Sequence, residues 1–506
     1  MVEGEERIMS GQSDVLGAMT DVPTGQEGRR IVGATAIIML MHFLSKLLGF
    51  VQKAAVAAFF GTTGRADAIE VMERIFYTIY YIPEELLTHS FLPVFTRLRN
   101  QQGEKEAWRL AGFTLTLQAL LLIAVVGLVL VGAPALVALF ARGFREEEFR
   151  LSVELVRVAF WGLLGASLGS LTYVLLNCYK RFGVPAFGDV MWKGGIIVAA
   201  LALCGRIGAV GYAMGFILGS LLKLATHLWG LRAKLSLLRL GWNLHYRPLR
   251  ELGLLMVPLL AGSLVAKVRD MLETQVASYG PEGTLATLGF AKKVVLTPVQ
   301  IFPYALGIAL FPFLAEWAVR QDRTRFTTAF LGAVRMMLFV FLPLTVLFVV
   351  LGEPIVELIY QRRAFTAADV QATLGPFLGY SLGMVVLGIE IICLQIFYSF
   401  ADTKTPFWVG LLTSSLHVFL SWVGCLAMGW GALGIALSHT LSRTVKVGVL
   451  FALMKRQGRI EGFRPEETLP FLGRILLATL LFGLTLTGGR HFVDPLFEDH
   501  IEATLH

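Results

Sequence analysis

The sequence IVGATAIIMLMHFLSKLLGFVQKAAVAAFF, residues 31–60, has the length of a membrane-spanning helix and carries two lysines in its interior. Lys46 and Lys53 are two helical turns apart, and Gly49 lies between them on the same stripe. A lysine at the centre of a membrane helix costs roughly 2.5–3.5 kcal/mol, so two of them require a reason. The stretch predicts a helix with one cationic, closely approachable face that lines a water-filled cavity and receives an anion.

The composition is that of a polytopic helical membrane protein. Of the 506 residues, 56% are hydrophobic and only 16% are charged, and the mean hydropathy is +0.68. These values exclude a soluble globular chain. The net charge of +8 does not indicate a nucleic-acid partner, because the basic residues lie in short loops between apolar segments. We therefore expect membrane lipids, and no nucleic acid, among the partners.

Neither the cysteines nor the N-terminus indicates secretion or a metal site. The four cysteines lie in or beside apolar segments without metal-type spacing, which predicts packing thiols: Cys178, Cys204, Cys393 and Cys425. Residues 1–30 are polar and mildly acidic, with no basic region followed by a short apolar run and a cleavage site. They predict a disordered cytoplasmic tail.

The rest of the chain divides into about thirteen apolar segments, several of them interrupted by Pro or Gly. Lys and Arg concentrate in alternate connections, around 97–109, 232–250 and 455–464, which places the N-terminus in the cytoplasm. The expected spans are 31–60, 68–95, 109–133, 151–178, 184–204, 208–231, 252–278, 285–313, 326–351, 373–400, 406–427, 431–454 and 468–487.

An internal repeat divides these spans into two halves. Gly208-Ala-Val-Gly211 with Lys223 recurs as Gly431-Ala-Leu-Gly434 with Lys446, at a constant offset of 223 residues. Pro83 with Phe91-Leu-Pro93 is echoed by Pro303 with Phe311-Pro312. The copies are six spans apart, an even number, so the halves share one orientation and predict two six-helix lobes related by an axis along the membrane normal. Chance similarity of Gly- and Ala-rich helices is the alternative.

The predicted organisation is therefore all-α, with an N-lobe, a C-lobe and additional C-terminal sequence. The N-lobe covers 31–232, the C-lobe 252–456, and one or two extra helices and a tail occupy 457–506. The connection 233–251 is basic and interleaved with Leu and Trp. It predicts an amphipathic linker on an anionic membrane surface, with a solvated loop as the alternative.

Intramembrane charges concentrate in the opening pair of spans of each lobe. We expect the first, second, seventh and eighth spans to line the interface between the lobes. Their charged and polar residues are Lys46, Gln52, Lys53, Glu70, Glu73, Arg74, Glu84, Glu85, His89, Lys267, Arg269, Asp270, Glu273, Lys292 and Lys293.

Two interpretations of these charges remain open. Glu70–Arg74 and Arg269–Glu273 are spaced i,i+4 and Lys267–Asp270 i,i+3, so internal ion pairs could explain them. Four lysines have no such local partner and favour an anion site: Lys46, Lys53, Lys292 and Lys293. Snorkelling to a membrane face is the alternative for the last three. A lysine binds phosphate as a mobile point charge, so such a site tolerates varied geometry.

The sequence contains no HExxH, GxSxG or P-loop pattern and no paired-carboxylate stretch at a membrane face. These absences favour a transporter over a membrane enzyme. A scaffold of wall synthesis is a further, weaker alternative.

At these residues the sequence resembles the MurJ (MviN) lipid II flippases of the MATE-like exporter (MOP) superfamily. The similar segments, in order, are Ser45-Lys46-Leu-Leu-Gly49-Phe50-Val51-Gln52-Lys53, Ala66-Asp67-Ala68, Phe91-Leu-Pro93-Val94-Phe95, Phe290-Ala291-Lys292-Lys293 with Pro298, Glu353-Pro-Ile-Val356, Ala364-Phe365-Thr366, and Phe397-Tyr398 with Asp402-Thr-Lys-Thr-Pro406. They cover about 31–456.

The resemblance implies V-shaped lobes around a cationic cavity and flipping of an undecaprenyl-diphosphate-linked peptidoglycan precursor by alternating access. It implies a multi-pass protein of the bacterial cytoplasmic (inner) membrane, with the cell-wall synthesis machinery as a partner. It implies diphosphate binding by Lys46, Gln52, Lys53, Arg74, Lys292 and Lys293, with Ser45, Asp67, Glu84 and Arg269 in support.

The family pattern is altered at several of these positions. Its cavity arginines correspond to Lys46, Gln52 and Lys293, and the acidic residues beside two of them have become Lys53 and Lys292. The family's arginine-containing motif in the second span is replaced around Thr78-Ile-Tyr-Tyr81. Another polyprenyl-diphosphate-linked oligosaccharide is therefore an alternative substrate, and a cation-coupled multidrug exporter of the same superfamily is an alternative function.

The resemblance also bears on coupling and on the C-terminus. Some members bind sodium in the second lobe, and the matching positions are Glu273, His417, Ser421 and Ser438. Oxygen ligands suit a hard cation, whereas His417 does not. We expect no cofactor, with Na+ or H+ as the coupling ion. The family has two spans after the twelfth, and only one, near 468–487, is evident in this chain.

Overall fold

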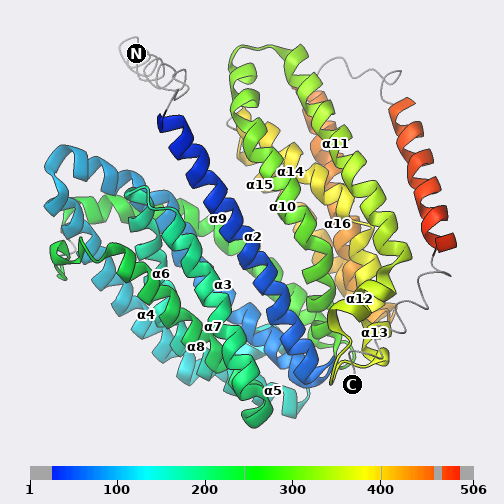
Figure 1. Cartoon of the computed structure of the whole chain (residues 1–506), viewed down its shortest axis with the longest axis horizontal. Coiled ribbons are helices and arrows are strands. Elements are labelled where there is room, and N and C mark those ends of the chain that lie inside the picture. The colour runs from blue at the N-terminus through cyan, green and yellow to red at the C-terminus, as the bar shows by residue number, and fades with distance from the viewer. Residues whose placement is uncertain (1–25, 244, 401, 461–469, 490–506) are drawn as a thin grey trace.

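A computed structural model describes residues 26–243, 245–400, 402–460 and 470–489 of the chain, and every regular element in these ranges is a helix (Figure 1). The predicted all-α fold is therefore confirmed. The first helix begins at Gln26, so the last residues of the expected disordered tail are helical. Residues 1–25 of that tail, and the chain after 489, lie outside the described residues.

The helices form two bundles and an extra C-terminal helix. The N-lobe consists of α2 (Gln26–Phe60), α3 (Gly64–Gln102), α4 (Glu104–Ala141), α5 (Glu146–Ala159), α6 (Trp161–Cys178), α7 (Gly183–Ile207) and α8 (Ala209–Leu231). The C-lobe consists of α9 (Arg247–Ser278), α10 (Thr284–Val319), α11 (Arg323–Val350), α12 (Gly352–Tyr360), α13 (Ala367–Ser381), α14 (Met384–Ser399), α15 (Lys404–Trp422), η2 (Val423–Ala427) and α16 (Gly431–Arg456). The last helix is Pro470–Gly489.

Ten helical stretches in the described part of the chain are long and apolar enough to cross a membrane. The expected spans that fall outside this group are α3, α9 and α16, which have 39, 32 and 26 residues. At 1.5 Å per residue, even α16 is about 39 Å long and can span the hydrocarbon core. These three helices fall short in hydropathy because they carry charged residues, many of which pair inside the protein.

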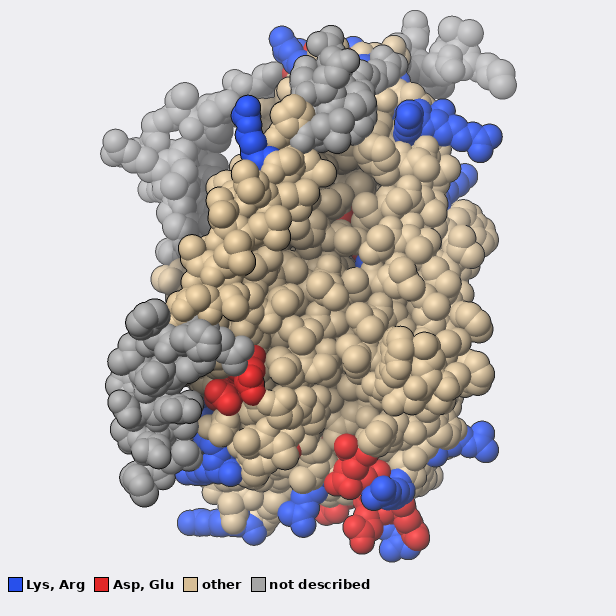
Figure 2. All heavy atoms as spheres, turned by 90° about the vertical axis from the view of Figure 1, so that its right-hand side faces the viewer, with Lys and Arg blue, Asp and Glu red and all other residues tan. Residues whose placement is uncertain are grey.

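The flank of the molecule agrees with a membrane location. Figure 2 shows a broad band of uncharged surface between charged groups above and below it. A hollow in the upper part of this face exposes acidic and basic atoms in its depth (Figure 2). Polar groups thus lie at the two ends and inside the protein, as a polytopic membrane protein requires.

The sequence repeat corresponds to a structural repeat. Gly208 and Gly431 precede or begin α8 and α16 with left-handed φ values of +62° and +52°, which glycine adopts without strain. One turn later, Gly211 and Gly434 approach the backbone of the preceding helical segment, at Cys204 and Cys425 respectively, too closely to admit a Cβ atom. The two-lobe, parallel-repeat prediction is therefore confirmed.

The repeated lysines are also equivalent in their environment. Lys223 is buried and pairs with Asp189 at 2.7 Å, and Lys446 is buried and pairs with Glu390 at 2.7 Å. Neither lysine reaches the surface. The four cysteines are likewise free and buried, as expected of packing thiols.

The lobes meet at one end of the molecule, which we call the closed end and which holds connections 61–63, 142–145, 279–283 and 361–366. Asp67 on α3 accepts hydrogen bonds from the backbone N–H groups of Gly283 and Ala286, both at 2.7 Å, at the start of α10. The backbone N–H of Gly64 donates to Glu282 at 2.7 Å. The opposite end, where α3 ends and α4 begins, is the open end.

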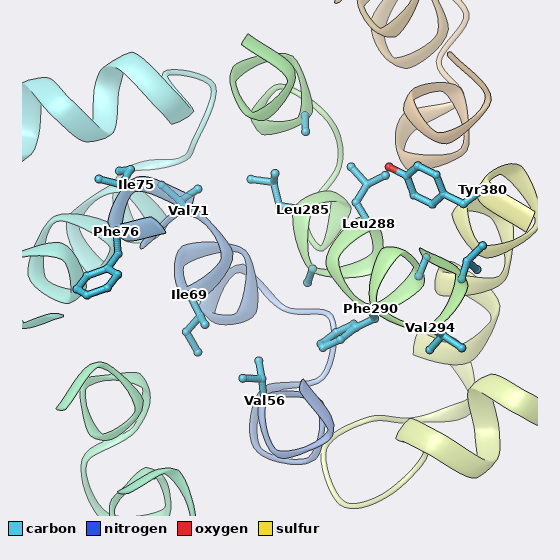
Figure 3. Close-up of a cluster of buried hydrophobic side chains, with 14 of the residues drawn as sticks. Val56, Ile69, Val71, Ile75, Phe76, Leu285, Leu288, Phe290, Val294 and Tyr380 are labelled. Carbon is cyan, nitrogen blue, oxygen red and sulfur yellow. The ribbon is translucent and has the colours of Figure 1, made fainter. Parts of the chain in front are cut away.

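Apolar packing joins the lobes beside these hydrogen bonds. Figure 3 shows Phe290 on α10 pointing toward Val56 on α2, with Ile69 on α3 nearby. All three side chains are almost fully buried. Figure 1 shows the bundles leaning together at this end and diverging toward the other.

The first half of α9 departs from the expected division into lobes, because it packs on the N-lobe. Leu252 belongs to a buried cluster formed with α3, α4, α6 and α8. Arg97 on α3 pairs with Glu251 at 2.6 Å, and Ser263 donates to Glu85 at 2.5 Å. Helix α9 therefore crosses from one lobe to the other on its way to the closed end.

The basic linker lies along α4. Its described residues contain the 3₁₀ turn η1 (Leu235–Leu237) and, from Arg247, the first turn of α9, and Lys234 pairs with Glu104 at 2.8 Å. The carbonyl of Arg239 lies against Gly112, and both Leu240 and Trp242 project outward with more than half of their surface exposed. This exposure of apolar and basic side chains favours the interfacial interpretation over a solvated loop.

The helix Pro470–Gly489 packs beside α11. Val346 lies against Gly483, and the Arg335 guanidinium lies 5.8 Å from the centre of the Phe471 ring. One extra span is thus present among the described residues.

Candidate functional site: a cavity between the lobes

A cavity of about 450 Å³ lies between the lobes, with walls from α2, α3, α9 and α10. These are the four helices that the sequence predicts at the interface. Five basic and four acidic side chains line the cavity, so its charge is closer to balanced than the sequence suggested. The lining includes Lys53, Glu70, Glu73, Arg74, Tyr77, Thr78, Tyr81, Lys267, Asp270, Glu273, Gly289, Lys292, Lys293, Leu296, Thr297 and Gln300.

Lys53 is neutralised by two carboxylates of α3. It pairs with Glu70 and, at 2.7 Å, with Glu73. Glu73 also accepts hydrogen bonds from Gln52 at 3.0 Å and from Tyr212. Lys53 is therefore not a free cation, because helix packing brings α3 carboxylates to it, and diphosphate binding by Lys53 stays a prediction.

Glu273 on α9 holds a second group of cations. It pairs with Lys292, and its distances to Arg74 and to the Nε2 atom of His417 are 3.4 Å and 2.9 Å. Lys292 is thus also ion-paired, and its part in diphosphate binding stays a prediction. The Arg74–Glu273 pair joins α3 of the N-lobe to α9, which enters the C-lobe here.

The local ion pairs considered from the sequence do not form. Glu70 pairs with Lys53 rather than Arg74, and Glu273 is bonded by residues of other helices rather than Arg269. Arg269 bonds instead to its neighbour Asp270 at 2.5 Å. Lys267 lies 3.6 Å from Glu85 on α3. The i,i+4 rule is overridden because facing helices offer closer partners in a low-dielectric interior.

Lys46 and Lys293 remain without an ion pair among the described residues. Lys46 donates to the Gln300 side chain at 2.9 Å. The Lys293 ammonium lies directly against Gly49, 5.2 Å from the centre of the Phe50 ring. Gly49 thus provides the close approach that its place between the two α2 lysines predicts. These two lysines are the predicted site residues that stay available for an anion.

Lys193 on α7 is a third such lysine, which the sequence reasoning missed. Its ammonium donates to the Tyr77 hydroxyl at 3.0 Å, and Tyr77 lines the cavity. Lys293 lines the cavity, and Lys46 and Lys193 bond to the lining residues Gln300 and Tyr77, so we call these three lysines around the cavity the lysine cluster. A lysine inside the apolar segment 184–204 is itself a signal for a functional residue and could have identified it.

One predicted binding residue, Gln52, and several predicted supporting residues are not part of the cavity lining. Gln52 is buried in the N-lobe and bonds to Glu73 and Tyr212 rather than facing the cavity. Asp67 bonds to the start of α10 at the closed end. Glu84 is half-buried with one oxygen that has no hydrogen-bond partner. Ser45 is half-buried on α2.

The residues suggested for a cation site are near one another but already engaged in part. Glu273 bonds to His417, Lys292 and Arg74, as described, so two cations and an imidazole already occupy its carboxylate. Ser438 donates to the Gly434 carbonyl at 2.6 Å, whereas the buried hydroxyl of Ser421 has no partner. The described residues contain no group of three or more His, Cys, Asp or Glu placed to hold a metal ion.

The cavity wall formed by α3 is aromatic toward the open end. The rings of Tyr77 and Tyr81 are stacked, with centres 5.6 Å apart and planes inclined by 20°. Lys193 lies 5.3 Å from the Tyr77 ring and Lys267 lies 5.2 Å from the Tyr81 ring. Tyr81 is 40% exposed. The family's arginine-bearing stretch is thus replaced by tyrosines bordered by lysines from other helices.

Comparison with known proteins identifies relatives across most of the chain. The family model described as lipid II flippase MurJ matches residues 56–504. The probable lipid II flippase MurJ of Vibrio cholerae is 25% identical over 475 residues, which cover 91% of this chain and 88% of the relative. The lipid II flippase MurJ of Burkholderia cenocepacia is 27% identical over 410 residues, which cover 77% and 79%.

Solved structures show the same fold. A lipid II flippase MurJ in an inward closed conformation matches with a TM-score of 0.75 and 20% identity, over 91% of this chain and 99% of that chain. An inward-facing multidrug resistance MATE transporter of the MOP superfamily matches with a TM-score of 0.71 and 13% identity, over 82% and 94%. The MATE-like fold predicted from the sequence is therefore confirmed. Because the family model covers most of its length, this chain belongs to the MurJ family of lipid II flippases.

Proposed function

We propose that this protein translocates lipid II, the undecaprenyl-diphosphate-linked peptidoglycan precursor, across the bacterial cytoplasmic membrane by alternating access. Family membership supports a lipid-flipping transporter rather than an enzyme. The observation that carries the binding chemistry is the cluster of Lys46, Lys193 and Lys293, which come from three helices and form no ion pair among the described residues. Three adjacent cations at a cavity suit a diphosphate.

The remaining cations limit how tightly the diphosphate is held. Lys53 and Lys292 are neutralised by Glu70, Glu73 and Glu273, so a diphosphate gains from them only by displacing a carboxylate. Lysines act as mobile point charges and do not impose the fixed bidentate geometry of arginine. A site of this kind captures an anionic headgroup and still permits its release, which transport requires.

Translocation then requires the lobes to separate at the closed end and to approach at the open end. The contacts that must break include the Asp67 bonds to the start of α10 and the bond from Gly64 to Glu282. Proline lies inside α3 at Pro83 and inside α10 at Pro303, where it removes a helical hydrogen bond and permits bending.

The chain is a multi-pass membrane protein, and we place its N-terminus in the cytoplasm from the distribution of Lys and Arg. The open end then faces the cytoplasm, where the precursor is made, and the closed end faces outward. Coupling to Na+ or H+ is part of the proposal, with Glu273 and His417 as the acid–base pair inside the C-lobe.

The test is complementation after depletion of the native protein in its host. Cells that rely on the Lys293→Ala variant should accumulate lipid II on the cytoplasmic leaflet and lose transport by about tenfold or more, because one cation of the cluster is missing. Lys293→Arg should retain transport. Lys105→Ala, which removes an exposed lysine near the open end, is the matched control and should behave as wild type.

Three results would contradict the proposal. Wild-type transport in the Lys293→Ala variant would remove the role of the lysine cluster. A normal leaflet distribution of lipid II after depletion, with accumulation of another polyprenyl-linked glycan, would reassign the substrate. Drug sensitivity after depletion without a wall defect would favour the multidrug-exporter function of the MATE branch.

A further inference from the structure

Two tyrosines of the cavity wall have no role in holding the diphosphate and yet are displayed to the cavity. Tyr77 and Tyr81 are one helical turn apart on α3, and both line the cavity with Thr78 between them. Their neighbour Tyr80 turns the other way and is buried in the N-lobe, where Lys223 donates to its hydroxyl at 3.0 Å. Tyr80 thus packs in the N-lobe core, whereas Tyr77 and Tyr81 line the cavity.

The stack has a cation at each end. Lys193 bonds to the Tyr77 hydroxyl and lies 5.3 Å from its ring, and Lys267 lies 5.2 Å from the Tyr81 ring. Each ring, with its negative π-face, therefore already has a cation of the protein close to it. A cationic or drug-like amine ligand would be repelled here, whereas a neutral ring with hydroxyl groups would not.

The surroundings of the stack are polar, and Arg74, the basic residue of α3 in the same lining, is engaged by Glu273 and Thr274 on α9. Thr78 lies on the same wall, Asp270 comes from α9, and Thr297 and Gln300 come from α10. The exposed part of Tyr81 offers a sugar ring an apolar contact, and the hydroxyl, amide and carboxylate groups around it offer partners for the sugar hydroxyl groups. This combination matches a pyranose more closely than a lipid tail.

The stack is also placed in register with the lysine cluster. Its Tyr77 end is bonded to Lys193, a member of the cluster, and its Tyr81 end lies one helical turn closer to the open end. A sugar attached to a diphosphate on the cluster would therefore be within reach of Tyr77 and Tyr81.

We propose that Tyr77 and Tyr81 form a sugar subsite that binds the saccharide attached to the diphosphate of the transported lipid. This inference rests on the proposed function and extends it, since it separates recognition of the sugar from recognition of the phosphates. It also gives the replacement of arginine by tyrosine in this span a functional consequence: the wall binds a neutral sugar where the family pattern has cationic groups.

The experiment measures binding of two probes to the purified full-length protein in lipid nanodiscs. Lipid II contains the sugar and undecaprenyl diphosphate does not, so the difference in affinity isolates the saccharide. Tyr81→Ala should weaken lipid II binding by about tenfold and leave undecaprenyl diphosphate binding unchanged. Tyr81→Phe, which keeps the ring, should bind lipid II within about threefold of wild type. Lys193→Met should weaken binding of both probes.

The matched control is Tyr304→Ala, which removes a tyrosine that is 59% exposed on α10 outside the cavity lining and should change neither affinity. Equal loss of both probes in Tyr81→Ala, or loss of neither, would overturn the sugar subsite while leaving lipid II transport by the wild-type protein as evidence for the proposed function. Wild-type protein that binds undecaprenyl diphosphate but gains nothing from the sugar would also overturn the subsite. Wild-type protein that binds neither probe and transports no lipid II would overturn both proposals.

Discussion

The position of the Lys293 ammonium depends on the absence of a side chain at Gly49. The ammonium occupies the place where a Cβ atom at Gly49 would lie, so the charge reaches the α2 face of the cavity only because residue 49 is glycine. Glycine in a helix interior is less stable than alanine by roughly 0.5–1 kcal/mol. Glycine at position 49 therefore lowers the stability of α2, and the space that it leaves for the Lys293 ammonium explains why a glycine is there.

Gly49→Ala separates stability from transport. The variant should be as stable as wild type or more stable by about 0.5–1 kcal/mol, because alanine favours the helix and a flexible lysine end can move aside. Transport should fall several-fold, because the displaced ammonium no longer joins Lys46 and Lys193. Thermal unfolding and lipid II transport are measured together. Gly127→Ala, where a Cβ atom meets open space, is the control, and unchanged transport in Gly49→Ala would contradict the role of Lys293.

Glu273 is the residue whose loss should cost the most stability. The residue is 4% exposed, and its carboxylate is bonded to Lys292, Arg74 and His417. Glu273→Gln leaves two partly buried cations, Lys292 and Arg74, without this counter-charge, which should lower the free energy of unfolding by about 1–3 kcal/mol. Thermal unfolding of the purified protein checks this.

A second substitution tests the cause. Lys292→Met in the Glu273→Gln background removes one of the stranded cations and should restore part of the lost stability. If the double variant is no more stable than Glu273→Gln alone, uncompensated charge is not the reason for the loss.

At the scale of elements, α10 is held at its first turn by a residue of another helix. No side chain of its own N-cap residue, Gly283, can accept the free N–H groups of the first turn, and Asp67 on α3 accepts two of them. The carboxylate also lies at the positive end of the α10 dipole. The start of α10 and the contact between the lobes are thus stabilised by the same interaction.

Asp67→Ala should therefore loosen the closed end. Loss of two charge-assisted hydrogen bonds should cost about 1–3 kcal/mol, with Asp67→Asn losing less because its amide oxygen can still accept. The measurement is thiol labelling of Ser278→Cys, which replaces a buried closed-end residue, and labelling should be faster in the Asp67→Ala background. Glu147→Ala, at an exposed closed-end residue, is the control. Equal labelling rates in both backgrounds would show that Asp67 does not hold this end together.

At the scale of the whole molecule, transport requires contacts between distant parts of the chain to break together. Thr62 bonds to Asp369 through its hydroxyl and through its backbone N–H at 3.1 Å, and the backbone N–H of Ala364 donates to the Ala58 carbonyl at 3.1 Å. These contacts join the end of α2 and connection 61–63 of the N-lobe to connection 361–366 and the first turn of α13 in the C-lobe. The lobes cannot exchange conformations while this seam is intact.

A reversible cross-link at this seam should stop transport. Cysteines introduced at Thr62 and Asp369 and joined by a short, reducible thiol cross-linker should abolish lipid II transport, and a reductant should restore it. The double variant without cross-linker is the control, and the four native cysteines are buried. Undiminished transport by the cross-linked protein would exclude opening at the closed end as a step of the cycle.

Prediction from the sequence succeeded where the signal is local. Apolar length and hydropathy located the helices, and the repeated GAVG and GALG segments located two equivalent helix starts. It did not identify the partners of the charges: Lys53 and Lys292 have no local partner of opposite sign and pair with carboxylates of facing helices, and Gln52, expected at the cavity, is buried in the N-lobe. Spacing along one helix cannot show which facing helix supplies a closer carboxylate, nor toward which side a residue near the boundary of a stripe is turned.

By itself the sequence determined that this protein is a two-lobed helical membrane protein with charged groups on the helices at the lobe interface, because burial of apolar length and the cost of intramembrane charge act on each segment separately. Only the tertiary structure decided which of those charges remain unneutralised. That outcome depends on distances of a few ångströms between helices remote in sequence, as where Glu70 and Glu73 meet Lys53 and where Lys293 lies against Gly49. Coulomb energies in a low-dielectric interior change steeply over such distances, and hydropathy along the chain does not contain them.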